Sequence, residues 1–319
     1  MAAKEIKKIV VIGAGTMGPG IAETMAITKA DVCLYARKEE KLEHAKAVIR
    51  SGLDVFAEEG KIGAEEVEDI FGRISFTTDF DIALKDADLV FEVITEDPGL
   101  KTEMYAKLDA ILKKDAIIAS NTSFLNIFEL MPEHRLETTV ITHWYSPPDV
   151  IPLVEVVPSE KTKPEVLEAV VDLLKRGGKT PVQMKKFIPG YIVNRIQASL
   201  NNEVFFLLDN GYCTAEEIDM AVKSSFIPRA MVLGLMQRID FGGLNMTYRN
   251  MKNKSYIPPE PVDMPKTLAE KVDKGELGVR TGKGFYDYTG KDITELYAKR
   301  DRQLAKSLKL VKEFMDDPI

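Results

Sequence analysis

The sequence is most tightly constrained near its amino terminus, where a short apolar run meets a glycine-rich turn. Ile9–Ile12 predicts a buried strand, Gly13-Ala-Gly15-Thr-Met-Gly18 follows at once, and Ile21–Thr28 has a helical pattern. The first glycine permits a tight turn, the second lets a pyrophosphate approach, and the third allows close packing of helix on strand. The helix terminus adds free N–H groups for an anion. We therefore expect a dinucleotide, bound by Gly13, Gly15, Thr16, Met17 and Gly18.

Up to about residue 185, short apolar runs alternate with amphipathic stretches. The apolar runs are Ile9–Ile12, Val32–Tyr35, Leu89–Ile94, Ala116–Ala119, Val140–Thr142, Leu153–Val157 and Pro181–Met184. The helix-like stretches include Lys38–Glu58, Leu100–Leu112 and Pro164–Arg176. Short buried strands that alternate with helices predict a mostly parallel, doubly wound sheet of the Rossmann type.

After Pro189 the strand signal ends and a helical period takes over. The helices expected there are Gly190–Asn210, Ala215–Ser224, Met231–Ile239 and Thr294–Phe314. We therefore expect an α/β domain in residues 1–186, followed by an all-α carboxyl-terminal domain in residues 187–319. The apolar segment Val204–Leu208 is wider than one buried stripe, which predicts a helical face shared with a second subunit in a homodimer.

The composition limits the partners that the chain can have. Lysine and arginine total 43 against 50 aspartate and glutamate, and this net charge of -7 argues against binding to nucleic acid. We find neither an apolar stretch near the ~18 residues of a membrane helix nor a secretion signal. The distant cysteines Cys33 and Cys213 and only three histidines argue against a metal site and fit a reducing compartment. We expect a cytoplasmic protein without a membrane partner.

The end of the second strand bears on the choice between NAD and NADP. An NAD site places an acidic residue there to accept a hydrogen bond from the ribose 2′-hydroxyl. This chain has Ala36, followed by Arg37 and Lys38. A small residue removes repulsion, and a guanidinium can bind a 2′-phosphate, so NADP is favoured and NAD remains possible. In a second interpretation, Arg37 and Lys38 only begin a solvated helix face.

A histidine and a carboxylate provide the candidate catalytic pair. His143 follows the strand Val140–Thr142, and Glu155 interrupts the apolar run Leu153–Val157. A carboxylate inside an apolar strand is costly to bury unless it is paired. A carboxylate partner fixes the tautomer of a histidine and raises its pKa, as a general base requires. A lone histidine at a strand end is more often structural, so the pair depends on both residues.

Seven motifs in one order resemble the 3-hydroxyacyl-CoA dehydrogenase family over nearly the whole chain. They are Gly13–Gly18, Phe91-Glu-Val-Ile-Thr-Glu96, Ser120-Asn-Thr-Ser123, His143 to Pro147, Leu153–Val157, Pro189-Gly-Tyr-Ile-Val-Asn-Arg195 and Thr281-Gly-Lys-Gly-Phe-Tyr286. The resemblance implies a Rossmann domain that carries the catalytic pair, joined to a helical domain for dimerisation and substrate binding. It also implies a hydride transfer between a nicotinamide cofactor and C3 of the substrate.

The resemblance assigns roles to matching residues. It implies that His143 takes the proton of the substrate's 3-hydroxyl. It also implies that Glu155 orients His143 and favours its charged form. Ser123 and Asn194 match groups that hold the reacting oxygen. Residues on the cofactor side are matched by Glu96, Lys101 and Asn121. From the residues alone, without the resemblance, a simple helix cap before Leu125 is a better explanation of Asn121 and Ser123 than a functional role.

Three departures from the family pattern concern cofactor and substrate. Ala36 replaces the acidic residue of the second strand. Where members that use acyl-CoA have Phe-Phe-Asn-Pro after the histidine, this chain has Trp144-Tyr-Ser-Pro147, so Ser146 would lose an amide contact near the substrate. Ile227–Gly234 replaces a glycine- and proline-rich segment of the acyl pocket. Arg229 in this segment is either a clamp for a substrate carboxylate or an exposed residue at a helix start.

The remaining features divide between two substrates. The region 39–69, where the family rests the CoA tail, holds ten acidic and four basic residues, a net charge of -6 that disfavours CoA. The ending Gly282–Tyr286, in contrast, is typical of the acyl-CoA branch. The first hypothesis is therefore an oxidoreductase of 3-hydroxyacyl-CoA in fatty acid metabolism. The second is a dehydrogenase of a free 3-hydroxy acid, of gulonate or carnitine type, and the third is a cofactor-binding protein without turnover.

Overall fold

The computed structural model describes residues 5–58 and 60–319, and the chain divides after Val193 into two compact units. The strands of the first unit are β1 (Lys8–Ile12), β2 (Asp31–Tyr35), β3 (Ile74–Thr77), β4 (Leu89–Glu92), β5 (Ile117–Ser120), β6 (Thr139–Trp144), β7 (Leu153–Pro158) and β8 (Thr180–Gln183). Its helices are α1 (Gly18–Ile27), α2 (Glu39–Glu58), α3 (Val67–Gly72), α4 (Phe80–Leu84), α5 (Pro98–Ile111) and α6 (Pro164–Arg176). Short 3-10 turns lie at Ala64–Glu66, Ile127–Glu129 and Glu133–Thr138.

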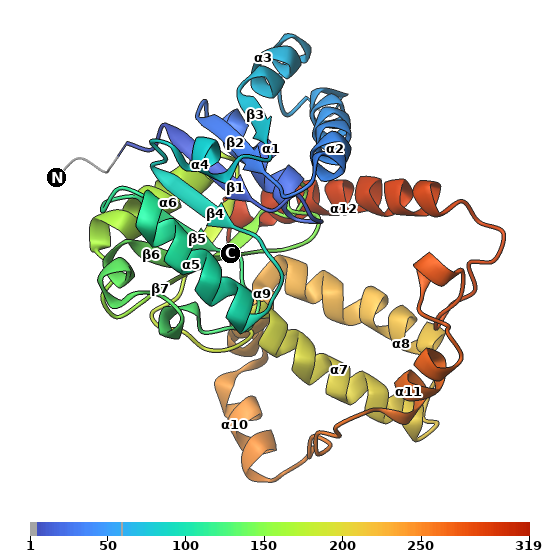
Figure 1. The fold of residues 1–319 in the computed structure, drawn as a ribbon. Coiled ribbons are helices and arrows are strands. Elements are labelled where there is room, and N and C mark those ends of the chain that lie inside the picture. The colour runs from blue at the N-terminus through green and yellow to red at the C-terminus, as the bar shows by residue number, and fades with distance from the viewer. Residues whose placement is uncertain (1–4, 59) are drawn as a thin grey trace. The chain divides into compact units, whose positions relative to one another are not determined.

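These strands form a single sheet in the order β3-β2-β1-β4-β5-β6-β7-β8 (Figure 1). The pairs from β3 to β6 are all parallel, β7 runs antiparallel to β6, and β8 is parallel to β7. The first six positions are the strand order of a doubly wound dinucleotide-binding sheet. The expected Rossmann-type fold with an all-α second part is confirmed.

Two apolar clusters cover the two faces of the sheet. On one face, α1, α2, α3 and α6 pack against side chains such as Ile9 and Val11. On the other face, α4 and α5 pack against Val10 and Ile12. Because successive side chains of a strand point to opposite faces, a parallel strand between two helical layers is apolar throughout. This explains the continuous apolar runs in the sequence.

The third strand, Ile74–Thr77, was missing from the predicted strands. Its sequence, Ile-Ser-Phe-Thr, holds only two apolar residues, and it forms the edge of the sheet beside β2. An edge strand buries less of its surface than a central one, so its apolar signal is weaker. The reversal of β7 and β8 was likewise not predicted, because apolar runs do not encode strand direction.

The second unit consists of helices. They are α7 (Val193–Asp209), α8 (Ala215–Ala221), a π-helical turn (Val222–Phe226), α9 (Ile227–Gly242), α10 (Leu244–Lys252), α11 (Lys266–Asp273) and α12 (Ile293–Asp316), with a 3-10 turn at Val279–Thr281. Helix α7 begins later than predicted, because Gly190 and Tyr191 have φ values of 78° and 48°. Helix α9 is longer than predicted and is kinked at Gly234, where φ is 65°. Among the described residues, no helix combines the length and apolar character needed to cross a membrane.

Specific contacts join distant segments of the second unit. The Asp209 carboxylate at the end of α7 accepts hydrogen bonds from the backbone N–H groups of Lys266 and Thr267, both at 2.8 Å, and so caps the start of α11. The Tyr286 hydroxyl donates to the Asp219 carboxylate of α8 at 2.7 Å. The family-like ending Gly282–Tyr286 therefore helps to hold the helical unit together.

A buried carboxylate lies between α1 and α2 of the first unit. Glu23 is 1% exposed, and a Cβ at Gly52 would lie only 2.4 Å from its Oε2 atom. Burial, and next the neighbouring Asp149, raise the pKa of Glu23 well above its ordinary value, although Lys179 opposes this. Burial also lowers the pKa of Lys179 to about 8. Glu23 therefore carries a proton in the folded chain at pH values where an exposed glutamate is ionised.

We expect Glu23→Gln to stabilise the first unit at neutral and higher pH. A raised folded-state pKa contributes stability that is present below pH 4.5 and lost as the pH rises through the folded-state value. Glutamine does not titrate, so the gain should be near zero at pH 4 and about 1 kcal/mol or more at pH 8. Urea denaturation followed by the fluorescence of Trp144, the only tryptophan, measures it. Glu103→Gln, at an exposed position of α5, is the matched control. A variant no more stable than the wild type at pH 8 would contradict this account.

Candidate active site

The turn between β1 and α1 has the geometry that a dinucleotide requires. Gly13 has a φ of 119°, and its N–H donates to the Tyr35 carbonyl at 2.9 Å, which ties the turn to the end of β2. A Cβ at Gly18 would lie 1.8 Å from the Gly13 carbonyl oxygen, so only glycine fits there. A Cβ at Gly15 would meet nothing within 4 Å. The exposed backbone at Gly15 and Thr16 and the N-cap Met17 therefore leave room for a pyrophosphate at the start of α1.

The residue after β2 is buried beside this turn. Ala36 is 6% exposed, and its N–H donates to the Thr77 carbonyl of β3. Arg37 and Lys38 are exposed, and Lys38 Nζ lies 3.7 Å from Glu40 Oε1. The position that selects the ribose in an NAD site thus holds a small apolar residue, and two exposed basic side chains follow it.

His143 and Glu155 lie directly opposite each other on the antiparallel strands β6 and β7. The two side chains share one face of the sheet, and His143 Nδ1 is 2.9 Å from Glu155 Oε2. Both are buried, with side-chain exposures of 4% and 1%. The structure therefore brings together the two residues that the sequence singled out.

Glu155 accepts four hydrogen bonds. Oε1 accepts from the backbone N–H groups of Ile192 and Val193 at 2.9 and 3.1 Å, and Oε2 accepts from His143 and from the Tyr145 hydroxyl at 2.7 Å. Burial by itself raises the pKa of Glu155, but these hydrogen bonds outweigh burial and lower it. Glu155 is thus an ionised carboxylate and can only accept, so Nδ1 of His143 carries a proton and Nε2 is free to act as a base.

Two aromatic rings pack against the imidazole of His143. The ring centroid of Tyr145 is 4.6 Å from that of His143, and the ring centroid of Tyr191 is 4.8 Å away. Tyr191 is 1% exposed, and its hydroxyl donates to the Thr122 carbonyl at 2.8 Å. Its left-handed backbone conformation is costly for a tyrosine and is maintained by these contacts. Neither ring was identified from the sequence.

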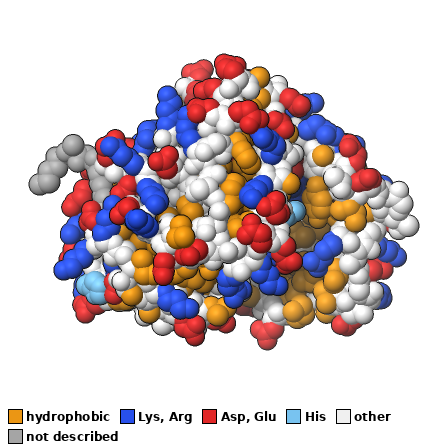
Figure 2. All heavy atoms as spheres, turned by 45° about the horizontal axis from the view of Figure 1, so that its top comes forward, with side chains coloured by type: hydrophobic (Ala, Val, Ile, Leu, Met, Phe, Trp, Pro, Cys, Tyr) orange, Lys and Arg blue, Asp and Glu red, His pale blue; other side chains and the backbone are white. Residues whose placement is uncertain are grey.

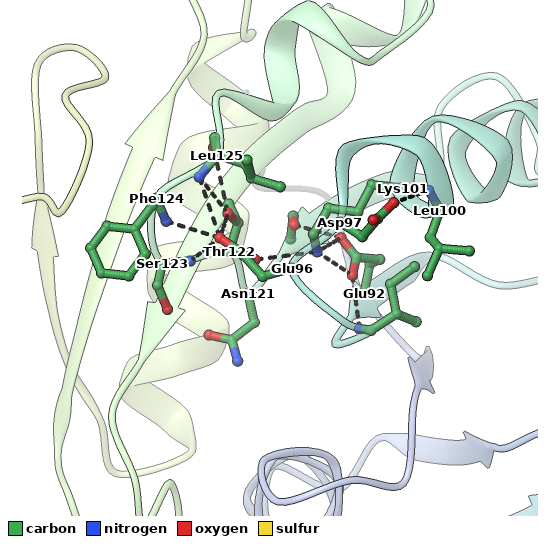
Figure 3. A network of polar contacts seen from close by, with 12 residues as sticks. Glu92, Glu96, Asp97, Leu100, Lys101, Asn121, Thr122, Ser123, Phe124 and Leu125 are labelled. Carbon is green, nitrogen blue, oxygen red and sulfur yellow. Dashed lines mark hydrogen bonds and ion pairs between the residues drawn. The ribbon is translucent and has the colours of Figure 1, made fainter. Parts of the chain in front are cut away.

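The loop after β5 is organised by Glu96 (Figure 3). Glu96 Oε1 accepts from the Thr122 hydroxyl at 2.5 Å and from the N–H groups of Ser123 and Phe124, both at 3.0 Å. Burial raises the pKa of Glu96, but these donors and Lys101 together lower it. In Figure 3 the side chains of Asn121 and Ser123 point away from Lys101. The loop that presents Ser123 is therefore fixed through its backbone, which leaves the side chain free for other contacts.

A buried ion pair lies next to Glu96, the residue that fixes the loop after β5. Lys101 and Glu92 are both 0% exposed, and Lys101 Nζ donates to the two Glu92 carboxylate oxygens at 2.7 and 2.9 Å. Glu92 Oε2 also accepts from the Tyr105 and Ser120 hydroxyls at 2.7 and 2.6 Å. Lys101 Nζ lies 3.8 Å from Glu96 Oε2. Lys101 was predicted on the cofactor side. In the structure its ammonium group is held by the carboxylates of Glu92 and Glu96.

Asn121 does not cap a helix. Its Oδ1 atom accepts a hydrogen bond from the backbone N–H of Trp144 at 2.9 Å, which joins the end of β5 to the residue after His143. The interpretation of Asn121 and Ser123 as a helix cap is wrong, because no helix begins at Leu125 and the next turn is the 3-10 segment Ile127–Glu129. Ser146 is exposed and lies just beyond the end of β6.

The other two predicted site residues belong to the second unit. Asn194 is half-buried in the first turn of α7. Arg229 is exposed in the first turn of α9, where its Nε donates to the Ser225 carbonyl at 3.1 Å. Among the described residues, no three His, Cys, Asp or Glu side chains are grouped to hold a metal ion.

Comparison with known families decides the assignment. Residues 8–187 match the family "3-hydroxyacyl-CoA dehydrogenase, NAD binding domain", and residues 190–288 match "3-hydroxyacyl-CoA dehydrogenase, C-terminal domain". The chain belongs to the 3-hydroxyacyl-CoA dehydrogenase family. The resemblance inferred from the seven motifs is thereby confirmed. As a member, the protein is an oxidoreductase that acts on a CH–OH group with a nicotinamide cofactor.

Relatives in this family include enzymes with different named substrates. The chain is 33% identical over 286 residues to a 3-hydroxybutyryl-CoA dehydrogenase from Clostridioides difficile, covering 88% of this chain and 99% of that protein. It is 31% identical over 303 residues to 5-formyl-3-hydroxy-2-methylpyridine 4-carboxylate 5-dehydrogenase from Mesorhizobium japonicum, covering 94% and 96%. A crystal structure of a 5-formyl-3-hydroxy-2-methylpyridine 4-carboxylic acid 5-dehydrogenase, described as an NAD+ dependent dismutase, has a TM-score of 0.85 at 30% identity, covering 97% of this chain and 99% of that one.

Proposed function

We propose that the protein interconverts a 3-hydroxyacyl-CoA and its 3-ketoacyl-CoA, with hydride transfer between C3 and a nicotinamide cofactor. The observation that carries the proposal is the buried contact of 2.9 Å between His143 and an ionised Glu155. Family membership and the named 3-hydroxybutyryl-CoA dehydrogenase relatives support the thioester substrate.

In this mechanism the protein's own residues accept and return the proton of the substrate hydroxyl. In the oxidative direction Nε2 of His143 accepts the proton of the 3-hydroxyl, and Glu155 stabilises the imidazolium through Nδ1. In reverse, the imidazolium protonates the oxygen formed at C3. A bound nicotinamide takes or supplies the hydride. We assign Ser123 and Asn194 to hold the reacting oxygen, and the loop contacts of Glu96 support a fixed position for Ser123.

The first test is turnover of the purified protein with acetoacetyl-CoA, run separately with NADPH and with NADH. Consumption of reduced cofactor at micromolar acetoacetyl-CoA would support the thioester. Binding of reduced cofactor without turnover would refute it and point to a free hydroxy acid. Absence of turnover with either substrate class would leave the non-catalytic hypothesis.

A second candidate substrate is a free 3-hydroxy acid or another small carboxylate. The relative from Mesorhizobium japonicum is named for a pyridine carboxylate, and the similar crystal structure covers almost the whole chain. Near α2, Lys46 pairs with Glu43 at 2.5 Å, and Arg50 pairs with Glu68. These pairs neutralise basic side chains in a region that is acidic overall and would have to accept the CoA phosphates. In this hypothesis the exposed Arg229 binds the carboxylate. Comparing a 3-hydroxy acid with its CoA thioester at equal concentration distinguishes the two.

We propose NADP as the preferred cofactor. The buried Ala36 carries no charge, and the exposed Arg37 beside it can bind a 2′-phosphate through its planar guanidinium.

Ala36→Asp should therefore reverse the preference. The carboxylate would repel a 2′-phosphate and accept from a ribose 2′-hydroxyl. We expect kcat/KM with NADPH to fall at least about tenfold while that with NADH rises, since one charged contact is worth about 1.4 kcal/mol or more. Arg37→Gln should lower only the value with NADPH. A wild-type enzyme that prefers NADH would contradict the proposal, and Trp144 fluorescence checks that the variants fold.

We propose that the protein is a homodimer formed through its helical unit. Helices α7, α8, α9, α10 and α11 contain no buried residue among those described. Large apolar side chains such as Leu200, Met236 and Tyr248 are exposed on them. A second copy would cover such faces. Light scattering at micromolar concentration should give the mass of two chains, and the mass of one would refute the dimer.

We further assign the enzyme to the cytoplasm and to fatty acid metabolism, with no nucleic-acid or membrane partner. Cys33 and Cys213 are free thiols, in keeping with a reducing compartment. Figure 2 shows basic and acidic side chains mixed over the face in view, which gives no continuous basic surface there. Growth of a deletion strain on fatty acids would test the metabolic assignment.

A further inference from the structure

A tyrosine hydroxyl shares a carboxylate oxygen with the catalytic histidine. Tyr145 lies two residues after His143, so both side chains are on the same side of the chain at the end of β6. Its hydroxyl is 2.7 Å from Glu155 Oε2, which is shorter than the 2.9 Å between His143 Nδ1 and the same oxygen. Burial, together with the hydrogen bond to Glu155, raises the pKa of Tyr145, so the phenol keeps its proton and donates it.

The four donors around Glu155 are divided by kind between its two oxygens. Oε1 faces backbone N–H groups at the start of α7, and Oε2 faces the two side chains. Two donors on one oxygen compete for the same negative charge, so each weakens the bond that the other makes. The carboxylate is buried, which makes these hydrogen bonds stronger than they would be in water.

We propose that Tyr145 is a positioning residue that sets the strength of the His143–Glu155 interaction. By occupying part of Glu155 Oε2, its hydroxyl fixes the carboxylate and limits how strongly Glu155 holds the imidazolium. Removal of the Tyr145 hydroxyl should therefore strengthen the hold of Glu155 on the imidazolium. This inference rests on the proposed role of His143 as the base.

A second tyrosine beside His143 provides a matched control for Tyr145. Among the described residues, Tyr191 also packs against His143, and the charge of Glu96 in the loop after β4 acts on Tyr191 and raises its pKa. The hydroxyl of Tyr191 donates to a backbone carbonyl and not to Glu155. Tyr145→Phe and Tyr191→Phe therefore each remove one hydroxyl and keep a ring beside His143, but only the first changes the hydrogen bonds of the carboxylate.

The experiment follows the three histidines by NMR with labelled imidazole carbons. The resonance of His143 is assigned by its loss in His143→Gln, and His44 and His134 serve as internal references. In Tyr145→Phe we expect the titration midpoint of the His143 resonance to rise by about 0.5–1 pH unit, because Glu155 then bonds His143 more strongly. The midpoint in Tyr191→Phe should stay within about 0.2 unit of the wild type.

The acid limb of kcat/KM in the oxidative direction should move with the resonance. Below its midpoint, Tyr145→Phe should lose about three- to tenfold in rate, the equivalent of 0.5–1 pH unit. In a Glu155→Gln background the same substitution should cause no shift, because the charge that the two donors share is absent. This double variant separates the proposal from a general loosening of the site.

The outcomes distinguish this inference from the proposed function. An unchanged His143 midpoint in Tyr145→Phe, or an equal shift in Tyr191→Phe, would overturn the role of Tyr145 whatever the turnover. A shifted resonance with an unshifted rate profile would support the coupling of Tyr145 to the pair. That second result would overturn the role of His143 as the base.

Discussion

His143→Gln should lower kcat/KM by about 10²–10⁴-fold, the range in which a positioned general base contributes to catalysis. Glutamine keeps a polar side chain of similar reach, but its amide cannot accept a proton at neutral pH. Glu155 would still have Tyr145 and two backbone N–H groups as donors. The fold and the cofactor turn, which lies at the end of β1, should therefore be retained.

Two measurements make this result specific. Fluorescence titration should give a dissociation constant for the reduced cofactor within about twofold of the wild type, because the substitution removes no group of the glycine turn. His134→Gln is the matched control, since His134 lies on the surface of the same unit, 2.8 Å from Asp109. Full turnover by His143→Gln would overturn the mechanism for both substrate classes.

The pH dependence of the pair follows from the state of Glu155. Its pKa is lowered in the folded chain, so its contribution to stability is present above pH 4.5 and is lost as the pH falls through the lowered value. Glu155 therefore remains ionised throughout the neutral range. The acid limb of the rate profile should then report on the imidazole, and the stability that Glu155 contributes should be lost only below pH 4.5.

The functional residues could be predicted from the sequence where a local pattern marks them. Gly13 and Gly18 lie in a turn between a strand and a helix, and Glu155 is out of place in an apolar strand. The contact of Glu155 with His143 was a hypothesis only, because the spacing of the two residues does not reveal that their strands are antiparallel and in register.

Residues that act through contacts with distant parts of the chain could not be predicted from a local sequence pattern. Tyr145 was noted only as part of a departure from the family pattern, since its bond to Glu155 depends on the same strand register. Glu92 lay within a quoted motif, but nothing in the sequence shows that its charge is buried or that Lys101 reaches it from α5. Lysines are almost always exposed, so a fully buried one can be recognised only in three dimensions.

The fold was predictable where burial is deep and regular. Central parallel strands and the helix α6 have strong apolar patterns, whereas the edge strand β3 has a weak one. In the second unit four helices were predicted, but α10, α11, the π-helical turn Val222–Phe226 and the kink at Gly234 were not. The π-helical turn and the kink are local changes of helix geometry that leave no change in the period of apolar residues.

The buried ion pair of Glu92 and Lys101 yields the largest expected effect on stability. Lys101 is the only positive charge that the structure places on Glu92 among the described residues, and the other donors are the Tyr105 and Ser120 hydroxyls and the Ile94 N–H group. Replacing the lysine leaves a carboxylate in the interior with neutral partners alone. Removal of one member of a buried pair typically costs about 3–5 kcal/mol.

We therefore expect Lys101→Met to lower the free energy of unfolding of the first unit by about 3–5 kcal/mol. Urea denaturation followed by Trp144 fluorescence measures it, with Lys107→Met at an exposed position of the same helix as control. Glu92→Gln combined with Lys101→Met should recover most of the loss, because no charge is then left buried. Since Lys101 also lies beside Glu96, which fixes the Ser123 loop, kcat should fall in the single variant even where it is folded. A loss below about 1 kcal/mol, or a double variant no more stable than the single one, would show that the hydroxyl donors alone suffice to hold Glu92.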